Sequence, residues 1–230
     1  LKGNFFTASA EITVNVEDNF DNFIPGEGNA EEQLRMAAIM GGSYTLPCDV
    51  TLSKPLKVEA DMTLNLNGKT ITAALEEEGR HHYAILNNAN LVLEGEGAIN
   101  ARGIKNFGEM TINGNVTITN IDTNGGAAVW NEGKLTINNG TFTTNDQAGE
   151  GSYGAALNTR AGGEAVVNGG TFDTIYGGGY NGNVYGSATI VINDGTMNNV
   201  YGGGYQGNIY GNAQSVYSLT NKGVYIYGGT

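Results

Sequence analysis

Tyrosine is the residue type whose spacing in this chain points most directly to surface chemistry. Nine of the 12 tyrosines lie beyond residue 175, and six form pairs 25 residues apart (201 − 176 = 25): Tyr176/Tyr201, Tyr180/Tyr205 and Tyr185/Tyr210. Tyrosine offers an apolar ring and a polar hydroxyl together, and it is enriched at contact surfaces. We predict these six as binding residues for surface carbohydrate or protein. A second interpretation stays open, in which the rings stack and stiffen the Gly-rich segments around them.

Paired carboxylates are the other chemistry to look for, because glycosidic cleavage uses two acids about 5–9.5 Å apart. Three related units place Thr143, Asp173 and Asn198 at one equivalent position, so Asp173 has no acid beside it in a neighbouring unit. Asp194 belongs to an Asn-Asp-Gly turn, where aspartate is favoured for backbone reasons, and Asp122 has no repeat equivalent. We therefore predict that no residue is catalytic and that the chain is not an enzyme.

One histidine pair, His81-His82, follows the acidic run Glu76–Glu78 and resembles a set of metal ligands. Adjacent side chains on a strand point to opposite faces, however, and no second histidine cluster exists to complete a site. We expect a solvated loop there and no metal. The Gly-Gly-Gly runs lack the Gly-Lys-Ser/Thr ending of a phosphate loop, so no cofactor is predicted.

The charge balance excludes several partners. The chain has 23 acidic and 11 basic residues, a formal net charge of −12, which disfavours binding to nucleic acid and to anionic lipid. No apolar run approaches the roughly 18–20 residues of a membrane span, so no membrane insertion is expected. The lone cysteine, Cys48, excludes an internal disulfide.

The elements that must position the tyrosines are repeats. Residues 175–188 recur as residues 200–213, and a fixed period of 20–50 residues marks a stacked-repeat architecture. From residue 62 onward, an apolar-x-apolar triplet precedes a polar turn six times, and the next residue is asparagine in five of them. The third residues of these triplets are Leu64, Leu93, Ile112, Ile137, Val167 and Ile192.

This unit predicts an all-β fold, a right-handed, single-stranded parallel β-helix. Asparagine and glycine tolerate positive φ, so Asn-x-Gly turns the chain between two short strands. We expect the six third-position residues to stack inside, and the asparagines to form a hydrogen-bonded ladder at about 4.8 Å spacing. A propeller fits less well, because each blade needs about 40–45 residues and the unit here is about 25 residues long. A sandwich also fits less well, because it requires no repeated motif in each unit.

Three segments are predicted. Residues 1–28 form an N-terminal docking segment, residues 29–42 a capping helix, and residues 43–230 the β-helix with Gly/Asn/Tyr-rich C-terminal coils. Leu34, Ala37, Ala38 and Gly41 fall on one face of a helix over Ala30–Met40, with Asn29 as its N-cap. Such a helix would cover the open strand edges at that end.

The units Ile137–Phe142 and Val167–Phe172, with the Tyr-Gly-Gly-Gly-Tyr-x-Gly-Asn coils, resemble right-handed parallel β-helix proteins of the pectate-lyase-like superfamily. The resemblance is to non-catalytic coils of bacterial surface proteins and bacteriophage fibres, and it covers about residues 30–230. It implies a structural or adhesive protein, a bacteriophage fibre or capsid-decoration protein that contacts a host surface. The implied location is the virion surface, or the extracellular or cell surface.

Two alternatives remain. The last residues, 227–230, open another Tyr-Gly-Gly unit, which favours a fragment of a gut-bacterial cell-surface adhesin. A polysaccharide lyase or hydrolase is the third possibility, because the superfamily includes such enzymes. For partners, we expect a homo-oligomer, a trimer by resemblance to phage fibres, and other virion or cell-surface proteins held through the N-terminal segment.

Overall fold

The computed structural model describes residues 30–73, 76–77, 80–123, 125–145, 154–160, 162–178, 188–202, 214–217 and 226–227. Within these ranges the chain forms one α-helix, two large sheets of parallel strands and one antiparallel hairpin. The predicted docking segment (1–28) and Tyr180, Tyr185, Tyr205 and Tyr210 lie outside them. Within them no helix has the length and apolarity that crossing a membrane requires.

The strands lie on three faces of one winding chain. Face 1 is the eight-stranded sheet: β1 (Gly42–Thr45), β4 (Met62–Asn65), β9 (Asn90–Glu94), β12 (Glu109–Ile112), β15 (Lys134–Ile137), β18 (Glu164–Val167), β20 (Thr189–Ile192) and β22 (Gln214–Tyr217). Face 2 begins with β2 (Val50–Thr51), β5 (Lys69–Thr72), β10 (Glu96–Ala101), β13 (Asn115–Asn120) and β16 (Thr141–Thr144). Face 3 contains β3 (Leu56–Val58), β8 (Ile85–Asn87), β11 (Ile104–Asn106), β14 (Ala127–Asn131), β17 (Ala155–Thr159) and β23 (Ile226–Tyr227).

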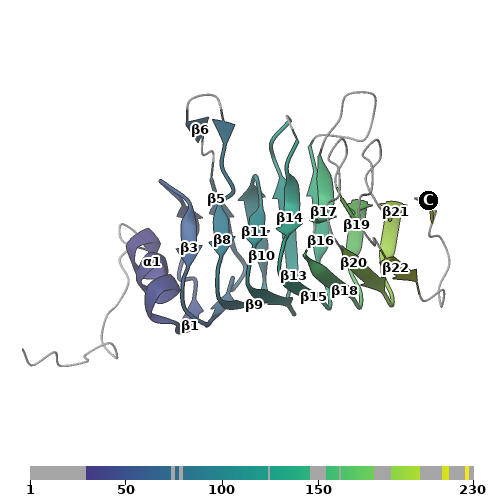
Figure 1. Ribbon diagram of the computed structural model, residues 1–230. Coiled ribbons are helices and arrows are strands. Elements are labelled where there is room, and N and C mark those ends of the chain that lie inside the picture. The colour runs from purple at the N-terminus through teal and green to yellow at the C-terminus, as the bar shows by residue number, and fades with distance from the viewer. Residues whose placement is uncertain are drawn as a thin grey trace, which may run out of the picture.

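Two long strands, β19 (Thr171–Tyr176) and β21 (Thr196–Tyr201), run across faces 2 and 3 and join them into one sheet. The chain visits face 1, face 2 and face 3 in turn and returns to face 1 one strand further along (Figure 1). This curled, parallel arrangement fits a parallel β-helix, and the predicted all-β class is confirmed. The expected loop around Glu76–Glu78 is instead an antiparallel hairpin of β6 (Glu76–Glu77) and β7 (Arg80–His81).

The core consists of apolar columns, one residue per coil. The six third-position residues of face 1 pair in register as predicted: Leu64, Leu93, Ile112, Ile137, Val167 and Ile192. The column of face 2 is Ile71, Ile99, Ile118, Phe142, Phe172 and Met197, and all of these side chains are buried. Each fully buried side chain of this kind stabilises the fold by roughly 1.5–3 kcal/mol.

The predicted asparagine ladder runs along the exposed corner between faces 1 and 2. The Nδ2 groups of Asn138, Asn168 and Asn193 each donate to the Oδ1 of the preceding ladder asparagine, at 2.7–2.8 Å, with Asn113 at the start. In the turns that follow Asn138, Asn168 and Asn193, glycine provides the positive φ: Gly140 (+122°), Gly170 (+103°) and Gly195 (+124°). At the same corner of an earlier coil Asn67 itself adopts a positive φ, +51°, as the expectation allows. The ladder asparagines thus serve the turn through their side chains.

A second asparagine ladder, which the sequence analysis did not predict, lies buried where face 3 turns into face 1. Asn87 Nδ2 donates to Asn106 Oδ1 at 2.7 Å, and Asn106 Nδ2 donates to Asn131 Oδ1 at 2.8 Å. Each amide also reaches a backbone carbonyl of the next coil, for example Asn106 Nδ2 to the Lys134 carbonyl at 2.9 Å. All three side chains are fully buried, so these hydrogen bonds replace water at each turn.

The helix α1 (Ala30–Met40) lies where the sequence predicts, and it covers the first coil (Figure 1). Leu34 and Ala38 are buried against the core, and Gly41 ends the helix with φ +82°. The Ala38 carbonyl accepts hydrogen bonds from the Glu59 and Ala60 amides at 2.8 and 3.3 Å. The helix therefore closes the apolar end of the stack.

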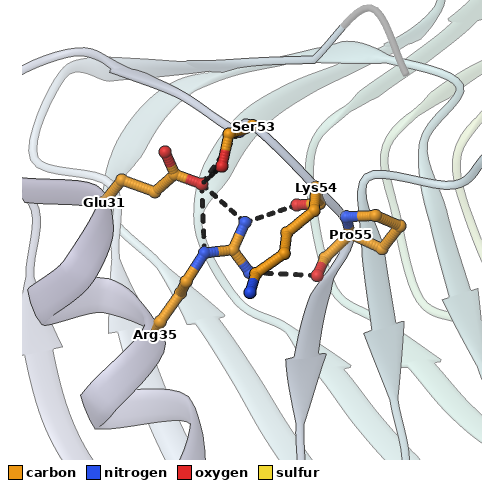
Figure 2. A network of polar contacts seen from close by, with 5 residues as sticks. All are labelled: Glu31, Arg35, Ser53, Lys54 and Pro55. Atoms are coloured by element: carbon orange, nitrogen blue, oxygen red, sulfur yellow. Dashed lines mark hydrogen bonds and ion pairs between the residues drawn. The ribbon is translucent and has the colours of Figure 1, made fainter. Parts of the chain in front are cut away.

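A polar network ties α1 to the same coil (Figure 2). Glu31 Oε1 accepts hydrogen bonds from the Ser53 amide and hydroxyl, both at 2.8 Å, and from the Arg35 guanidinium. Arg35 also donates to the Lys54 and Pro55 carbonyls. Burial acts to raise the pKa of Glu31, but the hydrogen bonds from Ser53 and Arg35 and the Arg35 charge outweigh it, so the pKa lies below its usual value.

Candidate ligand-binding face

Face 3 has an outer column of side chains that point away from the core. Because side chains alternate along a strand, the residue that directly follows the inward-pointing isoleucine, leucine or valine in each strand of face 3 points outward. In register, this outer column is Lys57, Leu86, Lys105, Trp130, Asn158, Tyr176 and Tyr201. It places two predicted tyrosines in line with the only tryptophan of the chain.

Tyr176 and Tyr201 stack on adjacent coils, with ring centroids 5.1 Å apart and an interplanar angle of 29°. Tyr176 is only 1% exposed, whereas Tyr201 is half-buried. Tyr176 joins Ala127 and Ala155 in a buried apolar cluster outside the main core, and Trp130 and Tyr201 pack against that cluster. Stacking is thus confirmed for this pair, and Tyr201 is the member that has exposed surface.

Trp130 lies within a group of charged side chains from neighbouring coils. The Lys105 ammonium is 5.5 Å from the Trp130 ring centroid and the Arg160 guanidinium carbon is 4.9 Å from it, both within cation–π range. Trp130 Nε1 donates to Glu132 Oε1 at 2.7 Å, and Lys105 Nζ lies 3.1 Å from the same oxygen. The cation–π contacts of the indole ring and the hydrogen bond of its N–H therefore both fix the orientation of Trp130.

Glu132 is the acid of this group. Burial acts to raise its pKa, but the hydrogen bonds from Trp130 and Lys105 and the charges of Lys105 and Arg160 outweigh it, and the pKa is lowered. The carboxylate stays ionised at neutral pH, and its Oε1 already interacts with Trp130 and Lys105. Lys105 also lies 4.6 Å from the ring centroid of Phe107, which is exposed. This part of the face presents aromatic surface beside two cations.

The corner between faces 2 and 3 holds a second polar group. Arg102 Nε lies 3.5 Å from Asp122 Oδ2, and the Arg102 guanidinium carbon lies 5.3 Å from the Tyr83 ring centroid. The Tyr83 ring meets Trp130 edge-on at 6.0 Å. These residues come from three successive coils, so their contacts tie the coils together at this corner.

The Tyr83 hydroxyl oxygen is buried and makes no hydrogen bond of normal geometry within the described part of the chain. Burial raises the pKa of the phenol well above its usual range, against the lowering influence of Arg102 and the Ala127 backbone. At neutral pH the phenol is therefore protonated and does not serve as a general base.

The acids that the sequence analysis weighed each have a local partner. Asp194 Oδ1 accepts the Gly195 amide at 2.8 Å, Asp173 Oδ2 accepts the Thr144 amide at 3.3 Å, and Asp122 faces Arg102. In the described ranges no group of three or more His, Cys, Asp or Glu side chains lies close enough to hold a metal ion. The His81 side chain is outside those ranges.

The sequence analysis missed Trp130, Lys105, Arg160 and Tyr83 as site residues. A signal for the column was present, because the triplets Ile85–Asn87, Ile104–Asn106 and Val129–Asn131 all end in asparagine. Their middle residues are Leu86, Lys105 and Trp130, one per coil. That second repeat would have placed Trp130 on an outward face.

Searches of protein-family models, curated proteins and solved structures find no match to this chain.

Proposed function

We propose that this chain is a non-enzymatic structural and adhesive protein that binds surface carbohydrate on the outer column of face 3. The observation that supports the proposal most is the line of Trp130, Tyr176 and Tyr201 on an outward face, separate from the apolar core. The core of each coil is already filled by aliphatic residues and phenylalanine, so these larger rings are not needed there. Sugar rings pack on aromatic faces, and tryptophan and tyrosine are the residues most enriched where binding energy concentrates.

A rigid column suits this function. Stacked coils hold successive side chains about 4.8 Å apart, so little conformational entropy is lost when an extended glycan lies along them. Tyr176 supports Tyr201 from one side, while Lys105, Arg160 and Glu132 hold Trp130. The contact residues of the proposed site are accordingly Tyr201 and Trp130.

The intrinsic fluorescence of Trp130 gives a direct assay, because the chain has no other tryptophan. Titration with a library of bacterial surface glycans should change this fluorescence for at least one glycan, and Tyr201→Ser should weaken that binding at least tenfold. Tyr44→Ser, a half-buried tyrosine on face 1, is the matched control and should leave it unchanged. No binding by any glycan, or equal losses in both variants, would refute the proposal.

Polysaccharide cleavage is the alternative, and the local partners of Asp122, Asp173 and Asp194 speak against it. Incubation with the bound glycan should release no new reducing or unsaturated ends. Turnover that disappears in Asp173→Asn or Asp194→Asn would overturn the non-enzymatic assignment.

The setting is also part of the proposal. We place the protein on a virion, as a fibre or capsid-decoration protein, with a bacterial cell-surface adhesin as the alternative, and we expect a homotrimer. We further propose right-handed winding, because crossovers between parallel strands are right-handed in about 98% of cases. Mass spectrometry of purified virions tests the location. Light scattering tests the trimer, which a stable monomer at micromolar concentration would contradict.

A further inference from the structure

Four Asn-Gly pairs lie within the described part of the chain, and the structure holds their reactive atoms in different ways. In such a pair the backbone nitrogen of the glycine can attack the side-chain carbonyl carbon Cγ of the asparagine, because glycine has no side chain to shield that nitrogen. The reaction is fastest where the fold already holds the two atoms near each other. The four pairs are Asn67-Gly68, Asn113-Gly114, Asn139-Gly140 and Asn168-Gly169.

The pair Asn139-Gly140 brings these two atoms together. The Gly140 amide donates a hydrogen bond to Oδ1 of the preceding Asn139 at 2.8 Å. Because Oδ1 is bonded to Cγ at about 1.23 Å, the Gly140 nitrogen lies at most about 4 Å from Cγ, near the separation of about 3–3.5 Å from which reacting atoms combine. Asn139 is exposed, so water and hydroxide reach its carboxamide.

In two of the other pairs the attacking nitrogen is bonded to a neighbouring coil. The Gly68 amide donates to the Glu96 carbonyl at 2.7 Å. The Gly114 amide donates to the Leu93 carbonyl at 3.3 Å. Each of these nitrogens must break a hydrogen bond between coils before it can attack, and this requirement slows the reaction.

In the fourth pair the carboxamide itself is held by the exposed asparagine ladder. Asn168 Nδ2 donates to Asn138 Oδ1 at 2.8 Å, and Asn168 Oδ1 accepts from Asn193 Nδ2 at 2.7 Å. Both ends of the amide are therefore bonded to other coils, and attack on Cγ would pull the side chain out of the ladder. Asn139 lies one residue beyond the ladder position Asn138.

We propose that Asn139 is a site of spontaneous deamidation. Hydroxide removes the proton of the Gly140 amide, the nitrogen forms a bond to Asn139 Cγ, and Nδ2 takes a proton from water and leaves as ammonia. Water then opens the cyclic succinimide. Breaking the bond from the Gly140 nitrogen to Cγ gives aspartate, and breaking its bond to the Asn139 backbone carbonyl carbon gives isoaspartate. Each product carries one negative charge more than asparagine, and the steps need neither oxidant nor reductant.

The aspartate product has a counterpart in the same chain. Asp194 occupies the equivalent position two coils further on, and its Oδ1 accepts the Gly195 amide at 2.8 Å, the same contact that Asn139 makes with Gly140. The repeat therefore already accommodates aspartate at this position, and the fold can be retained after the reaction.

Peptide mapping by mass spectrometry tests the site. The folded chain is incubated at mildly alkaline pH, and the mass gain from amide to carboxylic acid is followed at each Asn-Gly pair. Asn139 should react at least ten times faster than Asn113 and Asn168. In concentrated urea, which removes the contacts between coils, the three rates should become similar. Comparable rates in the folded chain, or a lead of Asn139 that persists in urea, would overturn the proposal.

A matched variant and the nature of the product test the chemical route. Asn139→Gln keeps an amide at the position but would have to close a larger ring, so its mass gain should fall at least tenfold while that of Asn113 stays the same. Enzymatic methylation of isoaspartyl carboxylates should detect isoaspartate at position 139 in aged wild-type protein. An undiminished mass gain in Asn139→Gln, or aspartate formed without isoaspartate, would indicate direct hydrolysis of the amide and refute attack by Gly140.

Discussion

Truncating one asparagine from each ladder separates the contribution of a buried ladder from that of an exposed one. Asn106→Ala removes three hydrogen bonds shorter than 3 Å, to Asn87, Asn131 and the Lys134 carbonyl, at a fully buried position. At about 1 kcal/mol for each bond, we expect a loss of about 3 kcal/mol. The former partners of Asn106 keep other bonds, since Asn131 Oδ1 still accepts the Gly133 amide, so the loss should not reach the full cost of orphaned groups.

The matched variant is Asn138→Ala in the exposed ladder. It removes two side-chain bonds of 2.7 and 2.8 Å, but water replaces them, and the expected loss is below about 1 kcal/mol. Urea unfolding followed by Trp130 fluorescence and by circular dichroism measures both variants. With a slope of about 3 kcal/mol per molar, the Asn106→Ala midpoint should fall by about 1 M. Equal losses in the two variants would show that burial does not set the strength of these ladders.

Three further outcomes are expected. Glu31→Gln should lower the melting temperature at pH 7, and the difference from wild type should shrink as pH falls below about 4.5, because a lowered carboxyl pKa stabilises only above the unfolded value. Phe142→Ala should cost about 3–5 kcal/mol in urea unfolding, since its ring is fully buried and stacks on Phe172 at 4.6 Å, whereas exposed Phe107→Ala should cost under about 1 kcal/mol. Gly195→Ala should cost about 1–3 kcal/mol, because φ is +124° and the added Cβ would lie 2.8 Å from the Gly170 carbonyl oxygen.

The fold was predictable because each coil repeats a local pattern with a direct physical meaning. The alternation in Leu135-Thr136-Ile137-Asn138 specifies a strand with one buried side, and its recurrence specifies stacking. The buried ladder was missed because asparagine at a strand end was interpreted only as a turn residue. A fully buried asparagine such as Asn106 is recognisable only when the next coil supplies a partner amide.

The surroundings of Trp130 were not predictable in the same way. Its contacts come from Tyr83, Lys105 and Arg160, which belong to different coils, and none of them occupies a repeated position with a conserved residue type within this chain. How close these side chains lie to Trp130 depends on the number of residues that connect face 2 to face 3 in each coil, and this number varies between coils. Coil spacing on face 3 varies, with 19 residues between Leu86 and Lys105 and 25 between Lys105 and Trp130 (105 − 86 = 19; 130 − 105 = 25).

The tyrosine stack begins beyond the end of the buried asparagine ladder. This position bears on the two interpretations of the tyrosines, as rings that stiffen the coils and as binding residues. Thr159 follows Asn131 in register and is fully buried, but its hydroxyl finds no hydrogen-bond partner in the described ranges. One coil further, a Cβ on Gly177 would lie 2.2 Å from the Gly202 carbonyl oxygen, so the backbones approach too closely there for a ladder side chain. From this point Tyr176 and Tyr201 stack on the outside instead. The stack holds the coils together, and Tyr201, its half-buried member, is the ring of this pair that has exposed surface. Because the stack fixes the orientation of Tyr201, the proposed ligand contact would need little further ordering of that ring.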